Sequence, residues 1–177
     1  MRKITYEGKH LDGDILPVRL KSRYIYPDFI SNESYSSDER VDDLLKLFVN
    51  EMEFPVYGND SSYQGMALME IMYFAESRDP FFNVVSLITA GIPNLLGMPF
   101  GNVMTDIEVS ITIKDFNNNK LKTYIGKGYA NTYIGLYWSY GGDAKRKSAM
   151  VAFKEAMQEI KIKVITDTDW LKGQLKK

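Results

Sequence analysis

Hydrophobic and polar residues alternate in several stretches of the chain, and this pattern is typical of strands with one buried face. The pattern is clearest in Thr105–Phe116, where isoleucine and valine at odd positions alternate with polar residues. Asn117–Asn119 follows and predicts a hairpin turn, because Asn tolerates positive φ. A return strand is predicted from about Leu121 to Thr132, and the earlier stretch Ile15–Pro27 predicts a half-buried strand.

Gly65–Ser77 is predicted to be a central strand with helices on one side. One face of this strand is apolar throughout, and the opposite face is mixed because Glu70 and Glu76 interrupt it. The apolar face is assigned to Ala67, Met69, Ile71, Tyr73 and Ala75.

Apolar residues at helical spacing predict two longer helices. The first covers roughly residues 37–53 and begins after a capping box formed by Ser36 and Glu39. The second starts near Asp143 and continues to about Val164. A Thr/Asp-rich break then precedes a short terminal helix at about 170–175.

The predicted order is β-α-β, a long apolar link, then β-β-α. This order favours an α+β fold in which two helices pack on a three- to four-stranded, mostly antiparallel sheet. Residues 1–14 are polar and glycine-containing and are expected to be a flexible lead-in, with residues 15–177 forming one domain.

Composition excludes several functional classes. With 22 basic and 23 acidic residues, the net charge is −1, which argues against a nucleic-acid partner. The chain has no cysteine and one histidine, His10, so no metal site, cofactor or catalytic triad is predicted. We expect a binding protein and not an enzyme.

The most unusual segment is Phe81–Met104, which contains no charged residue over 24 positions. Its prolines and glycines would interrupt a membrane-spanning helix. One interpretation is a loop folded over the open side of the sheet, with Val84, Leu87, Ile88 and Leu95 in the core. The other is an exposed segment that contacts a partner protein, a second copy of the chain or a membrane surface. The predicted contact residues are Phe81, Phe82, Leu87, Ile88, Ile92, Leu95, Leu96 and Phe100.

Three weaker candidates lie elsewhere. Gly141–Ser148 superficially resembles a phosphate-binding loop, but Arg146 stands where that loop needs glycine. Lys145, Arg146 and Lys147 could still receive an anion at the start of a helix, although a solvated turn is the simpler interpretation. Glu70 could be a tuned acid, or it could pair with the basic residues of the first strand.

Aromatic residues also gather beside glycines in one region. They could form a surface on which a sugar or peptide stacks, or they could cover an edge of the sheet. The group consists of Tyr129, Tyr133, Tyr137, Trp138 and Tyr140, with Gly126, Gly128 and Gly135.

Several short motifs together resemble a known family. An apolar stretch ends in Thr89-Ala90-Gly91-Ile92-Pro93, a clean strand ends in Lys114-Asp115, and Tyr124-Ile125-Gly126-Lys127-Gly128 precedes an alanine-rich helix. Over about residues 15–170 the chain resembles the small outer-membrane lipoproteins of Gram-negative bacteria. Their fold is similar to the amino-terminal domain of the Tol–Pal translocation protein and to the periplasmic domain of the curli secretion-channel lipoprotein.

The resemblance implies a lipid-anchored protein on the periplasmic side of the envelope that binds an envelope protein, itself or a membrane surface. The lipid-bearing cysteine of such proteins is not in this sequence. The envelope prediction therefore requires that cysteine to precede residue 1. If Met1 is native, the prediction becomes a cytosolic protein whose apolar segment buries a homo-oligomer interface.

Overall fold

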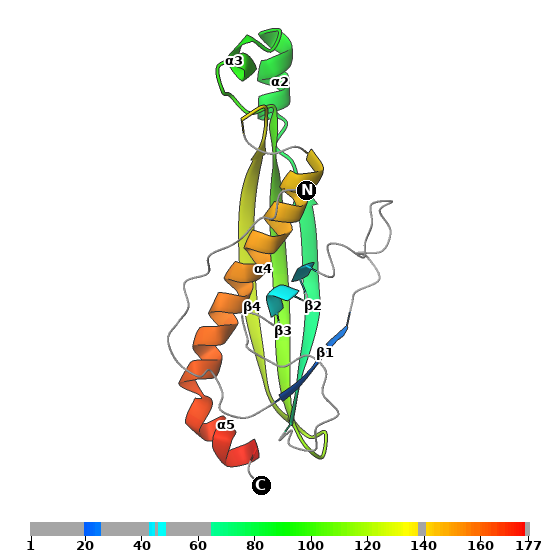
Figure 1. Cartoon of the computed structure of the whole chain (residues 1–177), viewed down its shortest axis with the longest axis vertical. Coiled ribbons are helices and arrows are strands. Elements are labelled where there is room, and N and C mark those ends of the chain that lie inside the picture. Colours follow the sequence, from blue (N-terminus) through cyan, green and yellow to red (C-terminus); the bar gives the residue numbers. More distant parts are fainter. Residues whose placement is uncertain (1–19, 26–42, 45, 49–64, 138–140, 176–177) are drawn as a thin grey trace.

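A computed structural model describes residues 20–25, 43, 44, 46–48, 65–137 and 141–175. Figure 1 shows a long, narrow sheet with one long helix lying along it and a small helical unit at one end. The elements are β1 (Leu20–Ile25), β2 (Gly65–Ser77), α2 (Phe81–Ile88), α3 (Ile92–Leu95), β3 (Gly101–Asp115), β4 (Lys120–Ile134), α4 (Gly141–Thr166) and α5 (Thr168–Leu175).

The four strands lie in the order β1-β2-β3-β4. β1 is parallel to β2, and the other two pairs are antiparallel. The predicted α+β class, with a mostly antiparallel sheet, is therefore confirmed. Of the predicted first helix, residues 43, 44 and 46–48 are helical and the rest lie outside the described residues, as do His10, the lead-in 1–14 and the side chains of β1.

The β3–β4 hairpin contains the two longest strands of the described sheet, with fifteen residues in each. The predicted asparagine turn closes it: Asn118 has φ +65°, and both the backbone N–H and the side-chain amide of Asn119 donate to the Asp115 carboxylate. These hydrogen bonds hold the pKa of Asp115 below its usual range. At a rise of about 3.3 Å per residue, the hairpin is roughly 50 Å long.

The predicted face of β2 is wrong beyond Ile71. The pairing of β2 with β3 shifts register between Ile71 and Tyr73, and an extra residue in one strand moves the following side chains to the opposite face. Tyr73 is therefore exposed, whereas Phe74 is partly buried against the core. Ala67, Met69 and Ile71 are buried as predicted.

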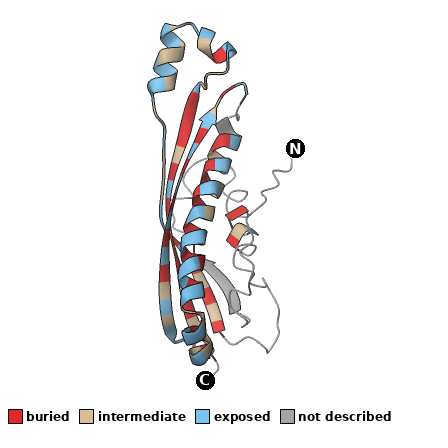
Figure 2. Cartoon of the chain, turned by 90° about the vertical axis from the view of Figure 1, so that its left-hand side faces the viewer, coloured by how far each residue is buried: buried red, intermediate tan, exposed pale blue. Residues whose placement is uncertain are grey.

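The core lies between the sheet and α4, which covers one face along most of its length (Figures 1 and 2). Alternate residues of β3 and β4 face the helix, and α5 adds Leu171 and Leu175 at the far end. The helical residues Leu44 and Phe48 join the same cluster. The side chains that α4 contributes are Ala152, Phe153, Ala156, Met157, Ile160 and Val164.

Candidate interaction site at the tip of the sheet

The uncharged segment forms two short helices beyond the ends of β2 and β3, and we call residues 81–100 the tip. A loop was predicted here, but α2 and α3 together hold twelve residues. Gly91 allows the reversal between them because it adopts φ +75°, a conformation that costs glycine little. Pro93 stands in the first turn of α3, where its missing N–H breaks no hydrogen bond. The residues that exclude a single long helix thus produce two short ones.

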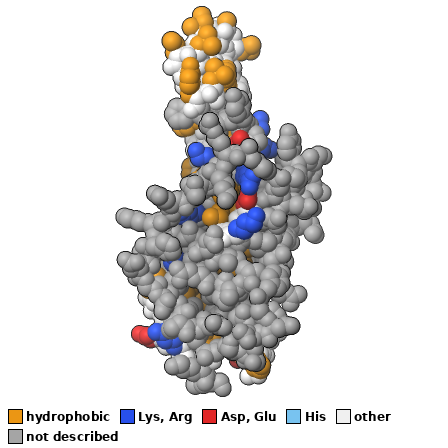
Figure 3. Space-filling view, viewed as in Figure 1, with side chains coloured by type: hydrophobic (Ala, Val, Ile, Leu, Met, Phe, Trp, Pro, Cys, Tyr) orange, Lys and Arg blue, Asp and Glu red, His pale blue; other side chains and the backbone are white. Residues whose placement is uncertain are grey.

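The tip is exposed on the outside of the molecule. No residue of α2 is buried, and Leu87 and Leu96 are 83% and 86% exposed. The interpretation that Val84, Leu87, Ile88 and Leu95 belong to the core is wrong, because all four are exposed. Figure 3 shows hydrophobic side chains gathered over the tip, with charged ones on the body below it. Of the predicted contact residues, Phe81, Leu87, Ile88, Ile92, Leu95, Leu96 and Phe100 are exposed, and Phe82 is partly buried.

Aromatic contacts hold the tip on the end of the hairpin. Phe82 meets Tyr133 of β4 edge to face, with ring centroids 5.7 Å apart. The Tyr137 hydroxyl donates to the backbone oxygen of Leu95 at 3.3 Å, and the Phe100 N–H donates to the Ile134 carbonyl at 2.7 Å. The tip is therefore fixed to β4 at two points and to Tyr137, just after β4, at a third, as well as continuing from β2 and β3.

Directly beneath the tip, hydrogen bonds between polar groups join the segment after β2, the start of α2 and the two strands of the hairpin. The Asn102 amide accepts the Asp79 backbone N–H at 2.9 Å and donates to the Asn131 side chain at 3.0 Å. The Asp79 carboxylate in turn accepts the Phe81 N–H at 2.9 Å. Asn102 is 2% exposed, and this buried amide joins the start of α2 to both strands of the hairpin.

The three predicted anion-binding cations do not act together. Lys145 lies 3.4 Å from Glu76 in an ion pair, and Arg146 pairs with Asp43. Lys147 is exposed and, with Tyr133 and Tyr137, lines a surface hollow beside the tip. An anion site on these residues stays a prediction, and it would depend mainly on Lys147.

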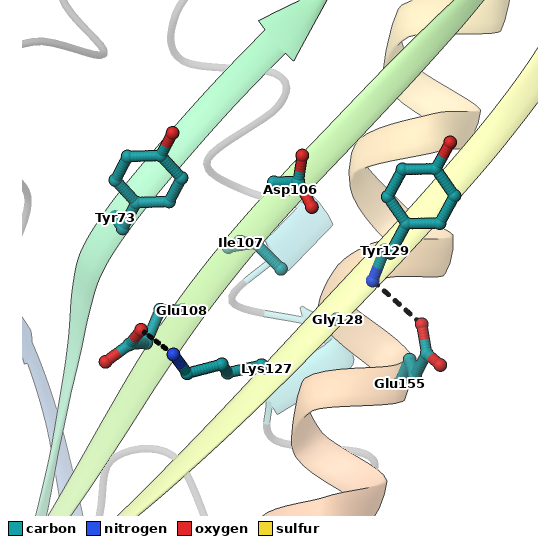
Figure 4. A pocket seen from close by; sticks show the side chains of 8 residues that line it. All are labelled: Tyr73, Asp106, Ile107, Glu108, Lys127, Gly128, Tyr129 and Glu155. Atoms are coloured by element: carbon teal, nitrogen blue, oxygen red, sulfur yellow. Dashed lines mark hydrogen bonds and ion pairs between the residues drawn. The ribbon is translucent and has the colours of Figure 1, made fainter.

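A second hollow, of about 490 Å³, lies on the outer face of the sheet and reaches Glu155 of α4 at the sheet edge (Figure 4). Tyr73, Asp106 and Tyr129 flank it, and Glu108 forms an ion pair of 3.0 Å with Lys127. The pairing neutralises two of the charges in this open hollow. Glu70 is exposed on β2, opposite Ser110 of β3, and it does not line this hollow.

The aromatic group divides between two places. Tyr129 and Tyr133 lie on β4, at the edge of the described sheet, and both Tyr133 and Tyr137 contact the tip. Trp138 and Tyr140 lie outside the described residues. Of the described members of this group, Tyr133 and Tyr137 thus support the tip, and a surface for stacking a sugar or peptide stays a prediction.

Over the ranges that the structure describes, no three His, Asp or Glu side chains are grouped closely enough to hold a metal ion. Within the same ranges, none of the helices has the length and apolar character needed to cross a membrane.

The fold is similar to that of solved bacterial proteins. A protein described as a candidate lipoprotein from Caulobacter crescentus matches with a TM-score of 0.50 and 10% identity, over 86% of this chain and 91% of that one. A minor lipoprotein from Acinetobacter baumannii matches with a TM-score of 0.42 and 11% identity, over 86% and 94% of the two chains. The rare lipoprotein B from Shewanella oneidensis matches with a TM-score of 0.33 and 8% identity, over 89% and 99%.

No protein-family model matches the sequence, and neither does any curated protein. At 10% identity the Caulobacter crescentus structure shows a shared fold. None of these three structures is a Tol–Pal or curli protein, so that part of the resemblance stays a prediction.

Sequence reasoning missed two kinds of residue at the tip. Val84 is exposed with Phe81 and Ile88, and its spacing of three and four residues from them on a helix would have identified it. The supporting residues Asn102 and Asn131 carried no signal in the sequence, because their contacts join strands that meet only in the folded sheet.

Proposed function

We propose that this protein is a lipid-anchored lipoprotein of the Gram-negative envelope that works by binding, without catalysis, and that its contact surface is the tip. The observation that carries this proposal is the exposed apolar tip itself. Apolar patches of this kind mark interaction sites on soluble domains, because leaving them in water is unfavourable.

The tip has the geometry of a contact site. It stands beyond the end of the sheet (Figure 1), and the aromatic and polar contacts at its base fix its position. Rigid presentation favours binding, because less conformational entropy is lost when the contact forms. The chain also enters the described fold at the opposite end: Leu20 pairs with Gly65, and Gly65 pairs with Asp115 beside the hairpin turn. An anchor upstream of β1 would leave the tip free.

The lipoprotein part of the proposal is supported by the shared fold with the Caulobacter crescentus protein. It is tested by intact-mass analysis of the native protein from the membrane fraction of its source. The expected species carries an acylated cysteine upstream of the present sequence. A native protein that begins with unmodified Met1 in the cytosolic fraction would contradict the anchor.

The contact is tested by photo-crosslinking in living cells. A photoreactive amino acid replaces Leu96 at the tip or, as a matched control, Phe116 at the opposite end, which is apolar and 80% exposed. We expect adducts from position 96 and none from position 116. If position 96 gives no adduct with a protein or a lipid, the tip is not the contact surface.

A further inference from the structure

We propose that the tip inserts into one leaflet of a lipid bilayer, so that its occupant is a membrane and not a groove on another protein. This inference rests on the proposed function and identifies the partner of the same surface.

The first observation is that exposed apolar side chains cover more than one side of the tip. Adjacent residues on a helix point about 100° apart, and both members of the adjacent pair Leu87 and Ile88 are more than three-quarters exposed. Leu95 of α3 and the following Leu96 are also both exposed. A groove on a protein would cover one side of such a unit and leave the other in water. A bilayer surrounds every side at once.

The second observation is that the tip satisfies most of its polar groups internally. The Ser86 and Thr89 hydroxyls each donate to a backbone oxygen one helical turn earlier, at 2.7 Å. The Asn94 side chain is 1% exposed and donates to the carbonyls of Met98 and Pro99, both at 3.1 Å. Among the buried side-chain atoms of the tip, the Asn94 Oδ1 lacks a donor.

Internal hydrogen bonding matters because hydrocarbon offers no substitute for water. A polar group left without a partner there costs several kcal/mol. The turn between the helices follows the same rule, since the Gly91 N–H donates to the Ser86 carbonyl at 2.8 Å. So does the segment after α3, where the Met98 N–H donates to the Pro93 carbonyl at 3.0 Å. The tip could therefore enter hydrocarbon with few polar groups left without a partner.

The third observation is the order of side chains below the apex. Tyr133 and Tyr137 lie at the base of the tip and share a hollow with the exposed Lys147. Tyrosine is favoured at the level of lipid headgroups, where its ring and hydroxyl meet different surroundings, and a lysine just outside can reach anionic headgroups. From the apex downward, the molecule thus presents apolar side chains, then tyrosines, then a cation, which is the order expected of a protein that enters a membrane surface.

The size of the tip limits how deeply it can insert into a bilayer. The eight residues of α2 are about 12 Å long, whereas the hydrocarbon core of a bilayer is about 30 Å thick. The tip therefore enters one leaflet without spanning the membrane, as interfacial helices do.

The absence of cysteine from the sequence allows a direct test with the full chain. Leu96→Cys and, as control, Phe116→Cys are labelled with a fluorophore that brightens in apolar surroundings. The proteins are mixed with vesicles of phosphatidylethanolamine and phosphatidylglycerol. We expect the label at position 96 to shift to shorter wavelength and to be quenched by lipids with a quencher on the acyl chain. The label at position 116 should not respond. A label at position 96 that stays in water would overturn the inference.

A variant with two charged substitutions at the tip tests how much the apolar side chains contribute to the affinity for vesicles. Leu87→Glu with Leu96→Glu should weaken vesicle binding by roughly 100-fold or more, since each lost apolar burial is worth about tenfold. Phe116→Glu, an equally exposed apolar position on the body, should leave binding unchanged. Circular dichroism confirms that each variant is folded. Equal binding by all three proteins would contradict the inference.

The two proposals fail in different ways. A tip that ignores vesicles but crosslinks to a protein in cells would overturn membrane insertion and keep the tip as a contact surface. A tip that neither binds vesicles nor gives an adduct in cells would overturn both.

Discussion

Two glycines of β4 set how closely α4 approaches the sheet. A Cβ atom on Gly128 would lie 1.8 Å from the Ala152 carbonyl oxygen, and one on Gly126 would lie 2.1 Å from that of Ala156. The small alanines on the helix face the glycines on the strand, so the backbones meet almost directly. This close contact explains both the Gly-x-Gly spacing of the strand and the alanine repeat of the helix.

We predict that Gly128→Ala destabilises the protein by about 1–3 kcal/mol or more, as overpacking of a tight core does. The clash is with backbone, so no flexible side chain can move away to relieve it. Urea denaturation followed by circular dichroism measures the change.

Gly173→Ala is the matched control. Nothing lies within 4 Å of a Cβ built at Gly173, and this residue lies within α5. Alanine should therefore stabilise the protein, by about 0.5–1 kcal/mol. Equal effects of the two substitutions would contradict the close-packing account.

At the element scale, α4 protects the exposed edge of the sheet. The Glu155 carboxylate accepts the Tyr129 N–H, and the Glu159 carboxylate accepts the Lys127 N–H, both at 2.8 Å. Lys163 donates to the Ile125 carbonyl at 2.6 Å. Four residues of a helix rise about 6.0 Å and two residues of a strand about 6.6 Å, so every fourth helical residue meets every second strand residue. An edge occupied in this way is protected from pairing with another strand.

This arrangement predicts a pH dependence. Hydrogen bonding to Lys163 and to the Lys127 N–H holds the pKa of Glu159 below its ordinary value of 4.5. A lowered folded-state pKa means that the stabilisation is complete above about 4.5 and is lost as the pH falls through the folded-state pKa. NMR titration of the Glu159 carboxyl carbon should show a midpoint below 4.5, and hydrogen exchange at the Lys127 amide, corrected for its intrinsic pH dependence, should become less protected in acid. Glu159→Gln should remove this acid-induced loss of protection. A titration midpoint of Glu159 at the ordinary pKa would contradict the hydrogen bonds to its carboxylate.

Long periodic patterns in the sequence predicted the bounds of the longer elements well. The predicted bounds of β2, Gly65–Ser77, agree with the structure, and those of β4 and α4 agree to within two residues at each end. β3 begins at Gly101, four residues before the predicted Thr105. The register shift at Ile71 could not be predicted, because an extra residue in a strand depends on its pairing with β3. The helices of the tip were missed because their prolines and glycines are also typical of loops.

At the scale of the whole molecule, two groups of apolar residues are prominent, and single apolar side chains such as Phe116 and Trp170 are also exposed on the body. One fills the core between the sheet and α4, and the other covers the tip beyond the end of the strands (Figure 2). The sequence identified both as hydrophobic, but composition alone does not distinguish a buried run from an exposed one. That distinction depends on where the ends of β2 and β3 lie relative to the helix, which only the folded structure shows.

The central claim is that something covers the tip in the native envelope. The most direct test compares the reactivity of Leu96→Cys toward a bulky maleimide in envelope fractions and in the purified, detergent-free domain, with Phe116→Cys as control. We predict that the thiol at position 96 is protected in the envelope and reactive in the purified domain, whereas the thiol at position 116 reacts equally in both. Equal reactivity at position 96 in the two preparations would show a tip that stays in water, and would contradict the account.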